Sequence, residues 1–258
     1  MSNLIKNELI KIYAKIGWVL VAIVFVAGIV MAPLSTGIIE SNNGAFYVYN
    51  LAGTLALVNL FTIIVSSTIF NIEISSGTIK FLLLRSYSRT AIIFSKMIAI
   101  FINSLILSVT LFISTLLASV IFFEYNNLFT SFQHFNYNNA ITMASLSIVS
   151  NILLTTFYIS LVFLLSVLFK SQMITSMIGY IFIFSSILIN FFISEIFSNY
   201  MIVQWNPFNL LNFRESVLGS EIVAVGNLSS LHMGLGLIVY IALMFAFTNY
   251  KFKKMDIS

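Results

Sequence analysis

Six long stretches of this chain contain no Asp, Glu, Lys or Arg, and they restrict the fold more than any other feature. A helix needs about 20 apolar residues to cross a bilayer core of roughly 30 Å. The stretches cover residues 16–39, 41–72, 97–123, 140–169, 171–194 and 222–250. Only 8% of the 258 residues are charged, whereas a soluble domain has about 25%. The sequence therefore predicts an all-α integral membrane protein, a single domain over 1–258 with six transmembrane helices.

The placement of the basic residues predicts the orientation of these helices. Eleven of the twelve Lys and Arg residues fall on one side of the six predicted spans, and Arg214 falls on the other. Because Lys and Arg are enriched in cytoplasmic loops, both termini are expected in the cytoplasm. The formal net charge of +4 is thus an orientation signal, and we expect no nucleic acid partner.

Residues 1–15 predict an amphipathic helix that lies in the membrane interface. On a helix, its apolar side chains fall on one face and its charged side chains on the opposite face, towards lipid headgroups. The apolar set is Ile5, Leu9, Ile12 and Ile16, and the charged set is Glu8, Lys11 and Lys15. A compatible alternative is that the lysines only anchor the first span.

The segment 196–228 is too apolar for a free loop and too interrupted for a span. It contains Trp205 and Phe208 on either side of Asn206 and Pro207. Aromatic residues of this kind are enriched at headgroup level. We therefore expect an extracellular helical hairpin of short helices in the outer leaflet, between spans five and six.

The chain lacks the motifs of common catalytic sites. It has no cysteine and no GxxxxGK[ST], HExxH or GxSxG pattern. We expect no enzymatic activity, no metal site and no cofactor in this chain. The middle of each span also lacks Asp, Glu, Lys and Arg, which disfavours a proton-coupled carrier, although sodium coupling through backbone carbonyls stays possible.

The segment between the second and third spans combines charge with a short apolar helix. Five of the twenty charged residues lie within 73–96. Residues 75–78, Ser-Ser-Gly-Thr, can end one helix and cap the next. The following residues 79–84 are apolar apart from Lys80, and an apolar surface outside the bilayer must be covered. Either the lipid interface covers it, as for a connector helix, or the groove of a partner protein does.

The pattern Glu73-x-x-x-Gly77-Thr78, followed by an apolar helix and then Ser88-Arg89, resembles the signature of ABC-2 type transporter permeases. Other features are similar to that family: a Glu-x-x-Lys start at Glu8, six spans with both ends inside, and the Asn-Pro-Phe element at 206–208. The chain departs from the family pattern because it lacks the usual proline near residues 85–87.

The resemblance implies a permease of the bacterial plasma membrane, in which 73–90 is a cytoplasmic coupling segment that docks on a separate ATPase. Two ATPase subunits, which bind ATP and magnesium, would work with two permease copies, identical or paralogous, among membrane lipid. The expected coupling residues are Glu73, Gly77, Thr78, Lys80, Phe81, Leu82, Arg85 and Arg89.

Polar stripes on the spans are candidates for a substrate path. The resemblance places spans one, two and five at the dimer cleft, which favours the stripes on spans two and five. Those stripes are Asn59, Thr62 and Ser66, and Thr175, Gly179, Ser186 and Asn190. A further stripe on span four comprises Ser147, Asn151, Thr155 and Tyr158. For any single stripe, ordinary packing between membrane helices through small and polar residues is the favoured explanation.

The uncharged stripes and the resemblance together suggest export of a partly apolar cargo. This cargo would be an amphipathic peptide of the toxin or bacteriocin type, or a lipid-like antibiotic. Two alternatives remain open. One is an ATP-independent secondary carrier or channel, and the other is a non-transporting immunity or scaffold protein of the membrane.

Overall fold

The computed structural model describes residues 1–35, 44–49, 51–75, 88–123, 128, 139–197, 204–219 and 228–254. Every regular element within these ranges is helical. The elements are α1 (Ser2–Ile12), a π-helical turn η1 (Tyr13–Gly17), α2 (Trp18–Ser35), α3 (Gly44–Tyr49), α4 (Leu51–Ser75), α6 (Arg89–Phe122), α7 (Ala140–Phe169), α8 (Gln172–Phe197), α10 (Pro207–Leu210), α11 (Phe213–Leu218) and α12 (Ser230–Lys253).

Five helical stretches of the described chain are long and apolar enough to cross a membrane, so the chain is a multi-pass membrane protein. They are Ser2–Leu34, Leu55–Glu73, Arg89–Phe122, Ala140–Phe169 and Ser230–Lys253. The predicted fifth span corresponds to α8, whose described apolar part, Gln172–Ser186, is shorter than a span. The all-helical fold is confirmed, and the six-span arrangement stays a prediction.

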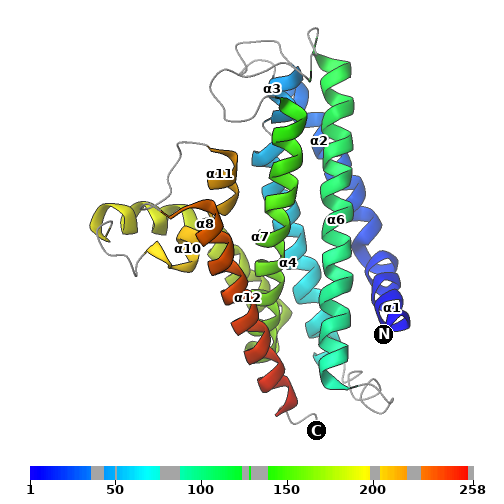
Figure 1. Cartoon of the computed structure of the whole chain (residues 1–258). Coiled ribbons are helices and arrows are strands. Elements are labelled where there is room, and N and C mark those ends of the chain that lie inside the picture. Colours follow the sequence, from blue (N-terminus) through cyan, green and yellow to red (C-terminus); the bar gives the residue numbers. More distant parts are fainter. Residues whose placement is uncertain are drawn as a thin grey trace.

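The long helices form a bundle in which α4 and α7 are the most enclosed (Figure 1). Helix α2 packs along α6, while α4 and α12 pack against α7. One core cluster joins α1, α2, α4, α6 and α7 and includes the buried side chains Leu20, Phe70, Ile100 and Phe163. A second cluster lies between α7, α8, α12 and the short helices α10 and α11.

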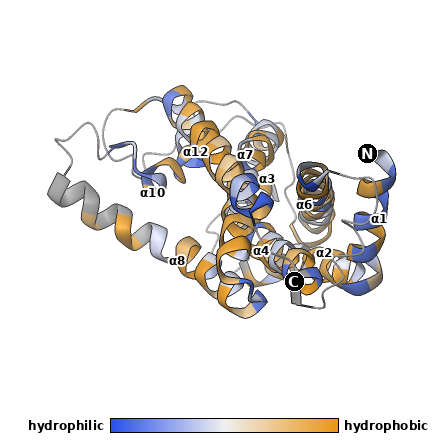
Figure 2. Ribbon diagram, turned by 90° about the horizontal axis from the view of Figure 1, so that it is seen from below, coloured by the Kyte–Doolittle hydropathy of each residue, from blue (hydrophilic) through white to orange (hydrophobic). Residues whose placement is uncertain are grey.

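The outward faces of the bundle are as apolar as its interior. Trp18, Phe184 and Leu243 are 69%, 64% and 61% exposed, and Figure 2 shows hydrophobic residues along the outsides of the long helices. Buried positions, in contrast, include many small polar residues, such as Ser66 and Ser104. Membrane helices show this arrangement because their outer faces meet lipid, while small and polar residues allow close contact between helices.

One end of the bundle collects the described basic residues other than Arg214, and we call it the basic end. It holds the starts of α1 and α6 and the ends of α4, α7 and α12, and both termini lie towards it in Figure 1. The basic residues there are Lys6, Lys11, Lys15, Arg89, Lys96, Lys170, Lys251, Lys253 and Lys254. The structure thus groups the charges as the sequence predicts, on one side of the spanning helices.

Short helices do occur within 196–228, as α10 and α11. The Asn206 side chain caps α10 by accepting a hydrogen bond from Asn209 N at 2.9 Å. Trp205 and Phe208 pack inwards: the ring of Phe208 stacks on Phe182 at 4.6 Å, and Trp205 meets His232 at 6.2 Å. Both rings thus contact α8 or α12 of the same chain, and their position at headgroup level stays a prediction.

Candidate functional site

Four charged side chains from three helices meet in one closed network at the basic end. Glu8 and Lys11 come from α1, Glu73 from the last turn of α4, and Lys96 from α6. Lys11 Nζ lies 2.8 Å from Glu8 Oε1 and 2.7 Å from Glu73 Oε1. Lys96 Nζ lies 2.8 Å from Glu8 Oε2 and 2.8 Å from Glu73 Oε2. Each lysine therefore lies beside both carboxylates. Three of the contacts are hydrogen bonds as well as ion pairs, whereas Glu73 Oε2 meets Lys96 as an ion pair without hydrogen-bond geometry.

Three members of the network are withdrawn from solvent, and the fourth is open to it. The side chains of Lys96 and Glu8 are 1% and 3% exposed and that of Glu73 is 10% exposed, whereas Lys11 is 49% exposed. Removing charges from water is costly, and the cost is offset only where opposite charges balance and are well placed. Two ammonium and two carboxylate groups balance here, so the network carries no net charge.

Apolar side chains on both sides of Glu8 bring the network together. Leu4 and Ile12, one helical turn before and after Glu8, are buried. Ile12 belongs to the same core cluster as Ile93 of α6. Packing of these side chains presses α1 against α6 and sets Glu8 beside Lys96. Lys11 follows Glu8 by three residues and therefore shares its side of the helix.

The cap of α6 decides where Lys96 falls. Ser88 accepts a hydrogen bond from Ala91 N at 3.2 Å and starts the helix at Arg89, as capping serines do. Lys96 thus lies two turns inside α6. A buried lysine needs partners, and Glu8 of α1 and Glu73 in the last turn of α4 supply them.

The prediction that Glu8 faces lipid headgroups, opposite the apolar face, is wrong. The buried residues of α1 are Leu4, Glu8 and Ile12, while Lys15 is exposed as expected. A helical projection of α1 alone assigns charged residues to the exposed side, because it does not include the residues of other helices that could pair with them. The sequence did contain a signal for the network. Two acidic and two basic residues lie beside apolar runs whose ends are expected at the same face of the membrane, so they could have been paired.

Two of the predicted coupling residues lie within the described chain. Glu73 is part of the network. Arg89 donates from Nη1 to the carbonyl oxygens of Phe252 at 3.0 Å and Lys253 at 2.8 Å, so it ties the start of α6 to the end of α12. The other six lie outside the described residues: Gly77, Thr78, Lys80, Phe81, Leu82 and Arg85.

The structure brings two of the predicted polar stripes together. Asn59 Nδ2 donates to Asn151 Oδ1 at 3.0 Å, and Asn151 Nδ2 donates back to Asn59 Oδ1 at 3.2 Å. Both residues are buried, at 6% and 1% exposure. This reciprocal amide pair joins the middle of α4 to that of α7, so the two side chains satisfy one another inside one chain.

The remaining hydroxyl groups of the predicted path donate to carbonyl oxygens of their own helices. Thr62 donates to Val58, Ser66 to Thr62, Thr175 to Ser171 and Ser186 to Ile183, at 2.6–2.7 Å. Gly179 permits close packing of α8 on α4, since a Cβ atom there would lie 2.9 Å from Ile63 Cγ2. On α7, Thr155 donates to the Ile152 carbonyl and Tyr158 is buried, and the Asn190 side chain lies outside the described residues. The arrangement explains these residues by packing, and a path along them stays a prediction.

Replacing Asn59 with leucine should destabilise the fold by about 0.6–1.7 kcal/mol, the range for hydrogen bonds between membrane helices. The loss arises because the amide of Asn151 keeps no partner in an apolar setting. The double change Asn59→Leu and Asn151→Leu should cost less than the sum of the single changes, because no amide is then left alone. Unfolding in mixed micelles followed by circular dichroism measures these values, with Ser145→Ala on the exposed side of α7 as the control. If the loss of stability in the double variant equalled the sum of the two single losses, Asn59 and Asn151 would not be a coupled pair.

Comparison with known proteins identifies a related protein and a matching family. It is 42% identical over 77 residues to a protein of Bacillus subtilis (strain 168) named "Uncharacterized protein YhcI", a match that covers 30% of this chain and 25% of that protein. The matched region is thus only a quarter of the relative's length. A family model described as "Protein of unknown function (DUF2705)" matches residues 19–258. Because this match covers most of the chain, the protein with this helical bundle belongs to the DUF2705 family.

Proposed function

We propose that this chain is the membrane permease subunit of an ATP-driven exporter of the ABC-2 type. The observation that carries the proposal is the network of Glu8, Lys11, Glu73 and Lys96. Glu73 precedes residues 76–87 and Lys96 follows them, and both are bound to α1. A force applied to the segment 73–90 would therefore reach α1, α4 and α6 together, as coupling to an external ATPase requires.

The grouping of basic residues supports a cytoplasmic position for the basic end, because Lys and Arg are enriched on that side. In this orientation both termini and the coupling segment face the cytoplasm of a bacterial cell, and α10 and α11 lie towards the outside. With α8 as a sixth span, the chain would have the layout of a permease. Two ATPase subunits and a second permease copy would complete the transporter.

The cargo we favour is an amphipathic peptide or a lipid-like antibiotic. Small polar groups along α4 and α8, with no charged residue among them, suit a molecule that is itself partly apolar. The energy would come from ATP bound with magnesium by the partner ATPase.

The first test is whether a neighbouring reading frame encodes a protein with a GxxxxGK[ST] loop and no spans, and the second is co-expression of this chain with that protein. We expect the two proteins to purify together and membrane vesicles to export a labelled amphipathic peptide in a vanadate-sensitive manner. The variants Gly77→Leu and Arg89→Glu should reduce both co-purification and transport. The control Lys15→Glu, an exposed charge outside the network, should retain both. Transport that continues without any ATPase would favour a secondary carrier and overturn the proposal.

A further inference from the structure

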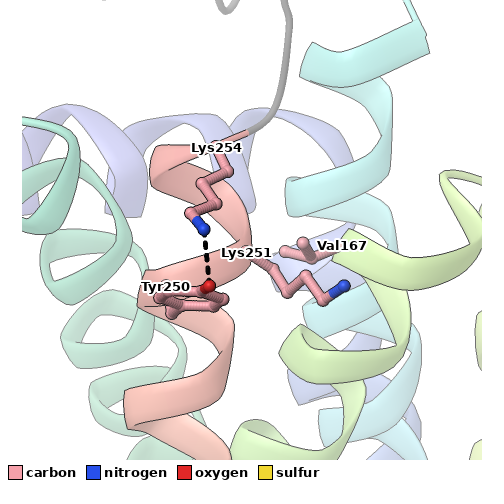
Figure 3. A pocket seen from close by; sticks show the side chains of 4 residues that line it. All are labelled: Val167, Tyr250, Lys251 and Lys254. Carbon is pink, nitrogen blue, oxygen red and sulfur yellow. Dashed lines mark hydrogen bonds between the residues drawn. The ribbon is translucent and has the colours of Figure 1, made fainter.

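A second cluster of basic side chains lines an open pocket at the basic end. The pocket has a volume of about 350 Å³ and is lined by Val167 of α7, by Tyr250 and Lys251 of the last turn of α12, and by Lys254, the C-cap of α12 (Figure 3). Lys254 folds back so that its Nζ atom donates to the Tyr250 hydroxyl at 2.5 Å. Lys251 extends on the side of Val167. The pocket thus places two ammonium groups and one phenol beside an apolar wall.

Neither lysine of the pocket has a carboxylate partner within the described parts of the chain, and the described ion pairs involve other residues. Both ammonium groups lie instead near aromatic rings. Lys254 Nζ is 4.4 Å from the centre of the Tyr250 ring, and Lys251 Nζ is 5.6 Å from that of Phe247. Such contacts do not neutralise an ammonium group, so among the residues up to Lys254 that the structure describes, the pocket presents two positive charges to an incoming group.

The pocket lies at the end of a helix, where exposed carbonyl groups carry a partial negative charge that would oppose an anion. Arg89 opposes this effect, because it places a positive charge on two of these carbonyl groups. Its guanidinium donates to the carbonyl oxygens of Phe252 and Lys253 at 3.0 and 2.8 Å. Phe252 is fully buried against Phe70, so the turn that carries the lysines is also held in place.

An apolar surface leads along α12 to the pocket. Its side chains are between 45% and 78% exposed and recur at helical spacing towards the basic end. They are Leu231, Leu235, Val239, Leu243, Phe247 and Tyr250. This stripe belongs to a helix that is long and apolar enough to span the membrane, so its upper part meets acyl chains and its lower end meets headgroups.

We propose that this pocket binds the headgroup of an anionic phospholipid. The phosphate lies between Lys251 and Lys254, the Tyr250 hydroxyl turns to donate to a phosphate oxygen, and an acyl chain follows the exposed stripe of α12. Basic pockets between membrane helices recognise phosphate-bearing headgroups in this way. The assignment is independent of the proposed transport function, since it depends only on the pocket and on the membrane position of α12.

The experiment is native mass spectrometry of the purified full-length chain in detergent, titrated with phosphatidylglycerol or with phosphatidylcholine. The unmodified protein should bind phosphatidylglycerol in preference. The double variant Lys251→Gln and Lys254→Gln should weaken that binding by about 25-fold, since each lysine near the membrane surface contributes about fivefold. The variant Tyr250→Phe should give a smaller loss.

A matched control removes the same charge elsewhere: Lys6→Gln and Lys15→Gln, both exposed and outside the pocket. It should keep the preference for phosphatidylglycerol, and the far-UV circular dichroism of all variants should be unchanged. An equal loss in the control would mean that net charge alone attracts the lipid and would overturn the site. Displacement of the lipid by inorganic phosphate at equal concentration would show a soluble anion as the ligand and would overturn the lipid assignment.

Discussion

Replacing Lys96 with methionine should lower the free energy of unfolding by about 3–5 kcal/mol, the usual cost of removing one partner from a buried ion pair. Methionine fills most of the volume of the lysine, so the loss comes from charge. Without Lys96, the carboxylates of Glu8 and Glu73 share only Lys11, and one buried negative charge has no partner. The variant Glu8→Gln should also be destabilised, because it leaves one carboxylate for two lysines.

The double variant Glu8→Gln and Lys96→Met restores the balance of charge. It keeps the contact between Lys11 and Glu73 at 2.7 Å, and should be more stable than the sum of the single changes predicts. Reversible unfolding in mixed micelles gives the three free energies. Lys15→Met, at an exposed position, should change stability by no more than about 0.5 kcal/mol. If Lys96→Met behaved like Lys15→Met, the network would contribute nothing to the fold.

Replacing Gly28 with valine should destabilise the packing of α2 on α6 by about 1–3 kcal/mol, as overpacking of a close contact does. A Cβ atom at Gly28 would lie 1.9 Å from Ser114 Oγ and 2.9 Å from Ser114 Cβ. The carbonyl of Gly28 also accepts a hydrogen bond from the Tyr47 hydroxyl at 2.5 Å, which restricts movement of α2 away from the contact.

Removing the opposing side chain should recover part of this loss. In the background Ser114→Gly, the change Gly28→Val should cost less than in the unmodified chain, which thermal unfolding in detergent can measure. Ala22→Val, on the exposed side of α2, serves as the control and should have little effect. A loss at Gly28 that is identical in both backgrounds would show that Ser114 is not the limiting neighbour.

The positions of the long helices could be predicted from the sequence because the bilayer fixes both the length and the composition of a span. The predicted fourth span, 140–169, coincides with α7, and the grouping of basic residues at one end was also predicted. The uncharged run of the second span ends at residue 72, whereas α4 continues through Glu73 to Ser75, and two lysines compensate the charge of Glu73.

The ion-pair network could not be predicted, because its four members are separated by up to 88 positions and each looks like an ordinary interfacial charge. Pairing Glu8 with Lys96 requires the packing of α1 on α6, which depends on the buried residues Leu4 and Ile12. The same limitation affects the polar stripes. The sequence placed Asn59 and Asn151 in the polar stripes of two different spans. Only the packing of α4 against α7 shows that the two amide groups hydrogen-bond to one another.

The π-helical turn η1 between α1 and α2 has a consequence for how motion would pass through the molecule. Helices kink at wide turns of this kind, and Figure 2, which looks along α6, shows α1 lying across the direction of that helix. Glu8 and Gly28 therefore lie on two helical segments that meet at Tyr13–Gly17. A displacement of α1 would reach α2 as a torque at this joint.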